Sequence, residues 1–432
     1  MNNIFSEFEA STETEWKAAL LQALKGPSIE EVLHYSDPIE RIDYTAYVHP
    51  SHATPSGEIP GEMSYKRGGK FKANTFEIVA ILPSGNATQR NKEALELLMK
   101  GTTSLRIDLD NHTVEECSQI VKGIGLEFII TTFLCHTREQ FEWVKSLSTP
   151  ANRGRIHVFY TGNTIAVDGA RTQLIDGTQV TNAGGNCTEE IAYLLHEGHG
   201  QLFQFIKQGI SVDDASAQLK FRIGIGSNYF FQIAKIRAFR RLWSAVIAEY
   251  QPAHSCSHIA YLEAETTSIN KSVKDPYTNL LRLTTEALSA IIGGVDELTV
   301  LPYDWGTRSP ELEKSQRLST NISLILKEEA YLEKVVDPGG GAYALESLTD
   351  ALIEKSWNQF QEIEVNGLEQ LKNQVAQTRE LRKTLFKEGR TTLIGVNKFK
   401  NPEKIANEWL NTQELVFGPE LILERDVTSL NA

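Results

Sequence analysis

Cysteine is scarce in this 432-residue chain, and its few thiols stand far apart. None of them forms a C-x-x-C pair, so the sequence predicts neither a disulfide framework nor a cysteine zinc site. The first ten residues also lack the basic and apolar segments of a secretory signal. We therefore expect reduced thiols and a cytoplasmic location. The four cysteines are Cys117, Cys135, Cys187 and Cys256.

An excess of basic residues and long apolar runs are missing as well. The formal net charge of -13 disfavours nucleic acid and anionic membranes as partners. No stretch reaches the 18 or so apolar residues that would predict a membrane span. No G-x-G-x-x-G follows the first predicted strand, which argues against dinucleotide binding. The chain has the composition of an ordinary globular protein, with 41% hydrophobic and 23% charged residues.

Strand-like apolar runs alternate with helical patterns from about residue 72. An alternation of this kind predicts a parallel sheet with crossover helices, and eight repeats favour a closed (β/α)8 TIM barrel. A further run at 155–160 is an extra or competing strand beside the one expected at 164–167. The eight expected strands are 76–82, 104–109, 126–133, 164–167, 221–225, 258–264, 297–301 and 332–336.

The organisation predicted around the barrel has three parts. Residues 1–71 hold a helix over 11–24 and a Pro-rich extended arm over 38–60, residues 72–345 form the barrel, and residues 346–432 form a helical extension. An extended arm needs a surface to satisfy its backbone, either a partner or its own barrel. Trp16, Tyr44 and Tyr47 are of residue types enriched at interface cores, so they are candidate partner contacts.

Two polar patterns on predicted helices allow a functional and a structural interpretation. Arg237, Arg240 and Arg241 share one helix face, which could meet a carboxylate or a partner subunit, or form salt bridges on the outside of the barrel. His196 and His199 have a spacing that can bind a metal. Without a third ligand nearby in the sequence, we predict no metal site there.

Four segments, in this order along the chain, resemble the methylmalonyl-CoA mutase family. The resemblance covers most of the chain before residue 380 and implies the (β/α)8 barrel. The segments are EWKAALLQALKG (15–26), GIGSNYFFQIAKIRAFRRLW (224–243), KDPYTNLLRLTTEALSAIIGG (274–294) and VVDPGGGAYALESLTD (335–350).

The chain departs from the catalytic members of that family at several motifs. None of its ten histidines stands in the Asp-x-His-x-x-Gly loop that supplies the cobalt ligand. The Tyr-His pair expected after the strand at 164–169 is missing, since no Tyr or His lies between Tyr160 and Tyr193. The Arg-Gln-Tyr of the first strand is replaced by Glu77, Ile78 and Val79, and the His-Thr-Asn motif is absent. We therefore predict no catalytic, cofactor-binding or metal residue in this chain.

The resemblance is thus to the small, non-catalytic subunits of the family. It implies a heterodimer in which a large catalytic subunit binds adenosylcobalamin and isomerises (R)-methylmalonyl-CoA to succinyl-CoA. A homodimer is the alternative for the isolated chain.

Two rival interpretations stay open. One is an acyl-CoA-binding scaffold that has lost mutase chemistry. The other is an independent TIM-barrel enzyme with an active site at the carboxyl ends of its strands. The polar residues near those predicted ends are Asp110, His136, Asp168, Arg171 and Glu265.

Overall fold

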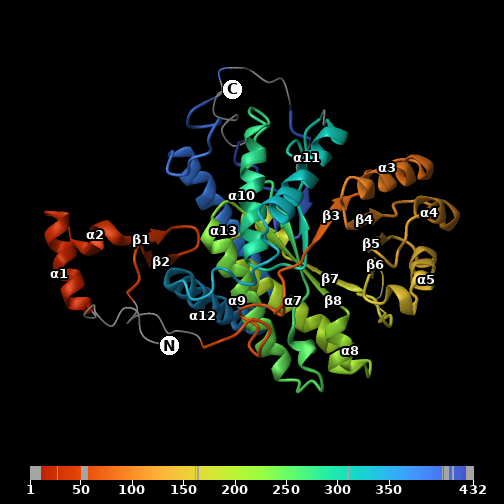
Figure 1. The fold of residues 1–432 in the computed structure, drawn as a ribbon, viewed down its shortest axis with the longest axis horizontal. Helices are drawn as coiled ribbons and strands as arrows, with labels where there is room; N and C mark the ends of the chain where they lie inside the picture. The colour runs from red at the N-terminus through yellow and green to blue at the C-terminus, as the bar shows by residue number, and fades with distance from the viewer. Residues whose placement is uncertain are drawn as a thin grey trace.

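An eight-stranded parallel sheet forms the centre of the computed structural model (Figure 1), in the order β6-β5-β4-β3-β10-β9-β8-β7. The structure describes residues 11–26, 28–49, 57–160, 162, 165–308, 311–400, 402, 408–410 and 413–424. The strands are β3 (Glu77–Ile81), β4 (Ser104–Asp108), β5 (Ile130–Cys135), β6 (Ile156–Tyr160), β7 (Gln173–Asp176), β8 (Leu219–Ile225), β9 (Leu262–Thr266) and β10 (Glu297–Thr299).

The sheet closes almost completely into a barrel. The first strand β3 pairs with β4 on one side and with the last strand β10 on the other. The two remaining edges, β6 and β7, meet through a parallel bridge between His157 and Arg171, where the Val158 amide donates to the Arg171 carbonyl at 2.8 Å. The (β/α)8 barrel expected from the alternating pattern is confirmed.

Four of the predicted strands are absent from the structure or begin several residues later. The competing run at 155–160 is β6, whereas 165–167 is irregular and Thr164 lies outside the described residues. The true next strand, β7, is a short polar segment, QLID, with no apolar run to mark it. Residues 332–336 form turns, in which the Lys334 amide donates to the Tyr331 carbonyl. Val335 is 55% exposed, whereas a barrel strand would bury it. The predicted strands at 126–133 and 258–264 begin later, as β5 and β9.

Helices surround the sheet, and one side carries a second layer. The long helix α9 is buried along most of its length, because α7, α10 and α12 pack around it. The helices of the barrel are α3 (Ala87–Met99), α4 (Val114–Ile120), α5 (Arg138–Leu147), α6 (Thr178–Asn182), α7 (Cys187–Lys207), α8 (Val212–Ala217), α9 (Tyr229–Ala248), α10 (Thr278–Ile292), α11 (Leu312–Leu324) with a π-helical turn at Ile325–Glu329, and α12 (Tyr343–Asn366), with 3-10 turns at Pro150–Asn152 and Ser255–His258.

The N-terminal region divides into a projecting part and a docked part. Helix α1 (Glu13–Leu24) has no buried residue and, with α2 (Ile29–Leu33), stands away from the barrel in Figure 1. It begins with a capping box at Thr12, within the helix predicted over 11–24. The antiparallel hairpin of β1 (His34–Asp37) and β2 (Ile42–Thr45) replaces the first part of the expected extended arm, and residues 50–56 of that arm lie outside the described residues.

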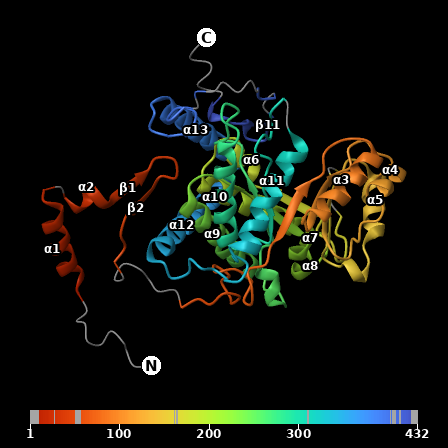
Figure 2. The same ribbon diagram turned by 45° about the horizontal axis from the view of Figure 1, so that its top comes forward.

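The C-terminal region packs on segments that follow the carboxyl ends of β7, β9 and β10 (Figure 2). The helix predicted over 345–377 is divided at Gly367, whose φ of 84° ends α12 before α13 (Leu368–Lys387) begins. Beyond it lie only the short strands β11 (Glu414–Leu415) and β12 (Gly418–Pro419) among the described residues, and the core of the helix predicted near 402–410 lies outside them. A search of the described helices finds none with the length and apolar character of a membrane span.

Candidate functional site

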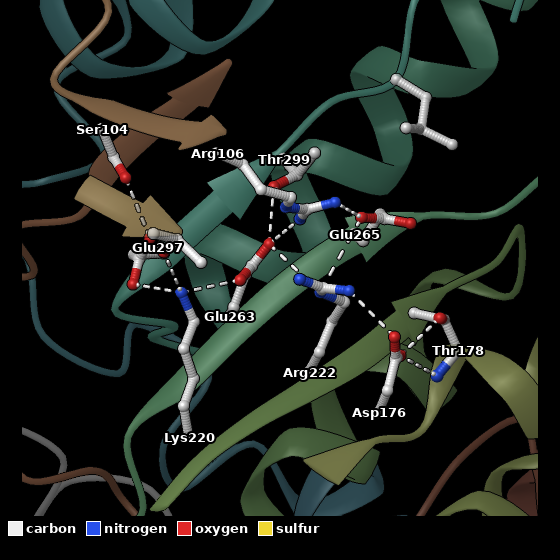
Figure 3. A network of polar contacts seen from close by, with 12 residues as sticks. Ser104, Arg106, Asp176, Thr178, Lys220, Arg222, Glu263, Glu265, Glu297 and Thr299 are labelled. Carbon is white, nitrogen blue, oxygen red and sulfur yellow. Dashed lines mark hydrogen bonds and ion pairs between the residues drawn. The ribbon is translucent and has the colours of Figure 1, made fainter. Parts of the chain in front are cut away.

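Charged side chains fill the interior of the barrel (Figure 3). Barrel interiors are usually packed with branched apolar residues, and charged residues are seldom fully buried unless they are paired. Here every one of five charged side chains from four adjacent or nearby strands is less than a tenth exposed. These residues are Arg106 on β4, Lys220 and Arg222 on β8, Glu263 on β9 and Glu297 on β10.

Lys220 lies at the centre of one half of this network. Its Nζ is 2.7 Å from Oε1 of Glu297 and 2.8 Å from Oε2 of Glu263. The other carboxylate oxygen of Glu297 accepts a hydrogen bond of 3.1 Å from the Ser104 hydroxyl. Lys220 and Glu297 are fully buried, so each depends on the other to compensate its charge.

Glu263 joins that half to two arginines. Arg106 bonds its Oε1 directly, the Thr299 hydroxyl donates to the same oxygen at 2.9 Å, and Arg222 Nε lies 3.3 Å away. Burial alone would raise the pKa of the Glu263 carboxyl. The surrounding Arg106, Arg222 and Lys220 outweigh it and hold this pKa well below its usual range.

The arginines are paired in turn with carboxylates at the carboxyl side of the network. Arg106 NH1 is 2.7 Å from Glu265, and Arg222 NH1 is 2.9 Å from Asp176, at the end of β7. Burial works to lower the pKa of Arg222, but Glu263, Asp176 and Glu265 together raise it. The interior therefore consists of cations and carboxylates within ion-pair distance of one another, and these pairs link β4, β7, β8, β9 and β10.

His157 borders this network and stays neutral. It is completely buried on β6, 3.6 Å from Glu297. Burial, and then the nearby positive charges of Lys220 and Arg171, hold its pKa well below the usual value for histidine. A proton on this ring would add a fourth positive charge to an interior that already holds three.

Two of the residues predicted at strand ends come together at the carboxyl face. His136, just after β5, has its Nε2 at 2.7 Å from Oδ1 of Asp108, at the end of β4. Asp110 lies beside them and is 3.5 Å from the buried Arg90. Asp108 was not among the residues predicted from the sequence, although it is the last residue of β4. Both members of the His136–Asp108 pair are more than two-fifths exposed, so solvent screens the interaction.

The other three predicted strand-end residues lie elsewhere. Asp168 forms an exposed pair of 2.7 Å with Arg153, beside the start of β6. The Arg171 guanidinium lies over the Tyr261 ring at 4.0 Å, at the amino ends of the strands. Glu265 belongs to the interior network. The structure therefore does not assemble the five residues into one site.

The arginine face of α9 is largely used within the chain. Arg237 is bonded to Asp337 and, at 2.5 Å, to Glu346, while Arg240 donates to the Gly293 carbonyl at 2.9 Å. Both arginines are at most 3% exposed, and Arg241 is half-buried. These internal contacts correspond to the salt-bridged alternative for this face and leave Arg237 and Arg240 unavailable to a partner.

The histidine pair of α7 contacts a carboxylate from another helix. Glu364 on α12 lies 2.6 Å from His196 Nδ1 and 3.6 Å from His199 Nδ1, and His199 Nε2 is 2.8 Å from the Tyr250 hydroxyl. These contacts link α7 to α12. Across the described part of the chain, no group of three or more His, Cys, Asp or Glu side chains is arranged to hold a metal ion.

The aromatic candidates of the N-terminal region lie in two environments. Trp16 on α1 stacks on Tyr47 with ring centroids 4.6 Å apart, and Tyr47 is 47% exposed. Tyr44 packs edge-on against Phe231 of α9 at 5.8 Å. A groove of 390 Å³ separates α1 from the hairpin and the start of α12, and Trp16 and Tyr47 line it.

The turn after β7 occupies the place where the mutase motif requires a Tyr-His pair. Because β7 and not 164–167 is the strand here, the residues just after this strand include Thr178 and Gln179. Thr178 is buried, and its hydroxyl donates to Asp176 at 2.5 Å. The corrected position still contains neither a tyrosine nor a histidine.

Comparison with known proteins agrees with the resemblance of the motifs. The family model "Methylmalonyl-CoA mutase" matches residues 158–417. The chain is 28% identical to a methylmalonyl-CoA mutase small subunit of Porphyromonas gingivalis, over 94% of this chain and 72% of that protein. It is 33% identical to a methylmalonyl-CoA mutase of Cereibacter sphaeroides and 31% identical to that of Escherichia coli, over 52% and 58% of this chain. Those two matches span only 33% and 36% of the longer relatives.

Proposed function

Since the chain belongs to the methylmalonyl-CoA mutase family, we propose that it is the non-catalytic subunit of a heterodimeric mutase. In this proposal a large partner subunit binds adenosylcobalamin and isomerises (R)-methylmalonyl-CoA to succinyl-CoA. The similarity to a small subunit over 94% of this chain supports the assignment. Three of the four cysteines are buried and all four are free, which fits the cytoplasmic location that we propose for the complex.

The charged interior of the barrel is the observation that carries this proposal. A barrel that admits an acyl-CoA needs space along its interior and polar groups aimed at the thioester. In this chain Lys220, Glu263 and Glu297 cross that space and bond one another, and they are at most 1% exposed. To make room for a ligand, the barrel would have to separate buried ion pairs, which costs about 3–5 kcal/mol when one partner is left unpaired.

The residues present do not fit a corrinoid in the family's manner. The cobalt ligand of the family is a histidine in an Asp-x-His-x-x-Gly loop, and no histidine follows His258 in this sequence. The described tail also contacts the barrel's own loops, with the Leu421 amide bonded to the Asn182 carbonyl at 2.8 Å and the Leu423 amide to that of Ile269 at 3.3 Å. We therefore assign the cofactor to the partner subunit.

The projecting N-terminal part is the partner surface that we propose. The docked hairpin is held on the barrel by Ile42, which is 2% exposed, and by the Glu40 carboxylate, which accepts from the Cys187 amide at 2.9 Å. Helix α1 has no comparable anchor, since none of its residues is buried. Its Trp16 and the adjacent Tyr47 present the aromatic surface that interface cores favour.

Reconstitution with a large mutase subunit tests the proposal. We expect the mixture to elute from gel filtration as a one-to-one complex containing adenosylcobalamin, and the isolated chain to elute without the cofactor. Stoichiometric cofactor on the isolated chain would overturn the non-catalytic assignment. Failure to associate with any large mutase subunit would instead favour the scaffold alternative.

A further inference from the structure

A second cavity lies over the carboxyl ends of β9 and β10, away from the charged interior and the N-terminal groove. It has a volume of 270 Å³, just below the range of about 300–1,000 Å³ that suits drug-sized ligands. The loop after β10 forms its floor, and the tail segment around Trp409 forms one wall. A bridge between Thr307 and Trp409, and a hydrogen bond of 2.7 Å from the Leu410 amide to the Gly306 carbonyl, hold the tail there.

The lining of this cavity includes aromatic and acidic residues. Two tryptophans, Trp305 and Trp409, line it together with the acidic residues Asp304 and Glu420. Among the described residues no Lys or Arg side chain lines this cavity. Arg308, the next cation along the loop, is paired with Glu408 at 3.2 Å. The lining therefore disfavours anions such as the phosphates of coenzyme A.

Asp304 is the residue that points most directly to a ligand. It is only 3% exposed, and one of its oxygens accepts from the Glu311 amide at 2.7 Å. Its other oxygen, Oδ1, has no hydrogen-bond partner, and neither has the buried hydroxyl of Thr307. Within the part of the chain that the structure describes, Asp304 forms no ion pair, and its Oδ1 is a buried acceptor without a donor.

We propose that this cavity binds a small organic cation, of the alkylammonium class, between the tryptophan rings and Asp304. Ring faces attract an ammonium group through the quadrupole of their π-systems, and tryptophan is the strongest of the aromatic side chains in this role. The Asp304 carboxylate supplies the opposite charge, and the volume limits the ligand to a few heavy atoms. The inference is independent of the proposed mutase function, because the cavity is separate from the barrel interior.

Choline and its uncharged isostere 3,3-dimethylbutan-1-ol provide the test, since they share a shape and differ in charge. The full-length chain is titrated with each probe, with tryptophan fluorescence and calorimetry as readouts. We expect saturable choline binding at least tenfold tighter than binding of the isostere. Equal affinity for the two probes, or no saturable choline binding at 10 mM (about 2.7 kcal/mol of binding free energy), would overturn the proposal.

Variants then locate the site. Asp304→Asn keeps the acceptor for the Glu311 amide, removes the charge, and should weaken choline binding at least fivefold. Glu313→Gln, on an α11 side chain that is 87% exposed and outside the cavity, is the matched control and should leave the affinity unchanged. If Asp304→Asn does not fold, Trp305→Leu at a half-exposed position serves instead, with the same expected loss. Undiminished choline binding in the folded variant contradicts the assignment.

Discussion

Lys220→Met removes the central cation of the barrel interior and keeps most of the side-chain volume. Lys220 lies 2.7 Å from Glu297 and 2.8 Å from Glu263. Glu263 retains Arg106 and Arg222 after the change, but Glu297 loses its cation, because burial, the largest cause of the low pKa of His157, still keeps the neighbouring ring neutral. The substitution therefore leaves one buried carboxylate without compensation.

The expected loss of stability follows from the one buried carboxylate that is left without a cation. Breaking one buried ion pair by removing a single partner costs about 3–5 kcal/mol, which is a large part of a typical free energy of unfolding of about 5–15 kcal/mol. The double variant Lys220→Met/Glu297→Gln removes the orphaned charge as well. We expect it to recover at least half of the loss, so the interaction free energy between the two sites should exceed about 1.5 kcal/mol.

Urea unfolding followed by circular dichroism measures all four corners of this double-mutant cycle. Asp168→Asn is the matched control, because its ion pair with Arg153 is 66% and 81% exposed and should contribute at most about 0.5 kcal/mol. A Lys220→Met variant that loses less than about 1 kcal/mol would mean that the interior is hydrated. The claim that the barrel is closed to an acyl-CoA would then fail.

Two further predictions concern pH and the N-terminal part. The pKa of His157 is held well below the usual value of about 6.5, so below that pH the unfolded chain takes up a proton that the folded chain excludes. The free energy of unfolding should therefore fall by up to about 1.4 kcal/mol per pH unit between pH 6.5 and 5.5. In urea titrations, His157→Gln should flatten this pH dependence. A parallel pH dependence in the variant would show that His157 is not responsible. Deletion of residues 1–27 removes α1 but keeps the docked hairpin, and it should leave the thermal transition nearly unchanged while weakening association with the large subunit at least tenfold, about 1.4 kcal/mol. Ile42→Ala is the matched control in the docked hairpin, and it should destabilise the barrel by about 2–4 kcal/mol while leaving α1 in place. Normal association of the truncated chain with the large subunit would show that α1 is not part of the interface.

Local sequence patterns were sufficient for most of the fold. The apolar run at 76–82 predicted β3, and the helix expected over 11–24 is α1. The pattern failed at β7 because this strand is four residues long and ends in Asp176, whose side chain points to the interior network instead of an apolar core. A strand this short and polar offers no apolar run that a pattern search could detect.

The charged interior could not have been predicted from the sequence. Its members are single charged residues in separate strands, and Arg106 and Glu263 are 157 positions apart. Each of them alone resembles an ordinary surface charge, and only closure of the barrel makes them neighbours. The same holds for Glu364, which approaches the two histidines of α7 from 168 residues away along the chain. By contrast, the missing Tyr-His pair was visible in the sequence itself, because no Tyr or His lies between Tyr160 and Tyr193, whichever segment forms the strand.

A turnover assay with the separate and combined subunits tests the central claim most directly. The purified chain is supplied with adenosylcobalamin and (R)-methylmalonyl-CoA, first alone and then with a large mutase subunit, and succinyl-CoA is measured by liquid chromatography. We predict no succinyl-CoA above background from this chain alone and sustained production from the combined subunits. Cofactor-dependent turnover by this chain alone would contradict its assignment as the non-catalytic subunit.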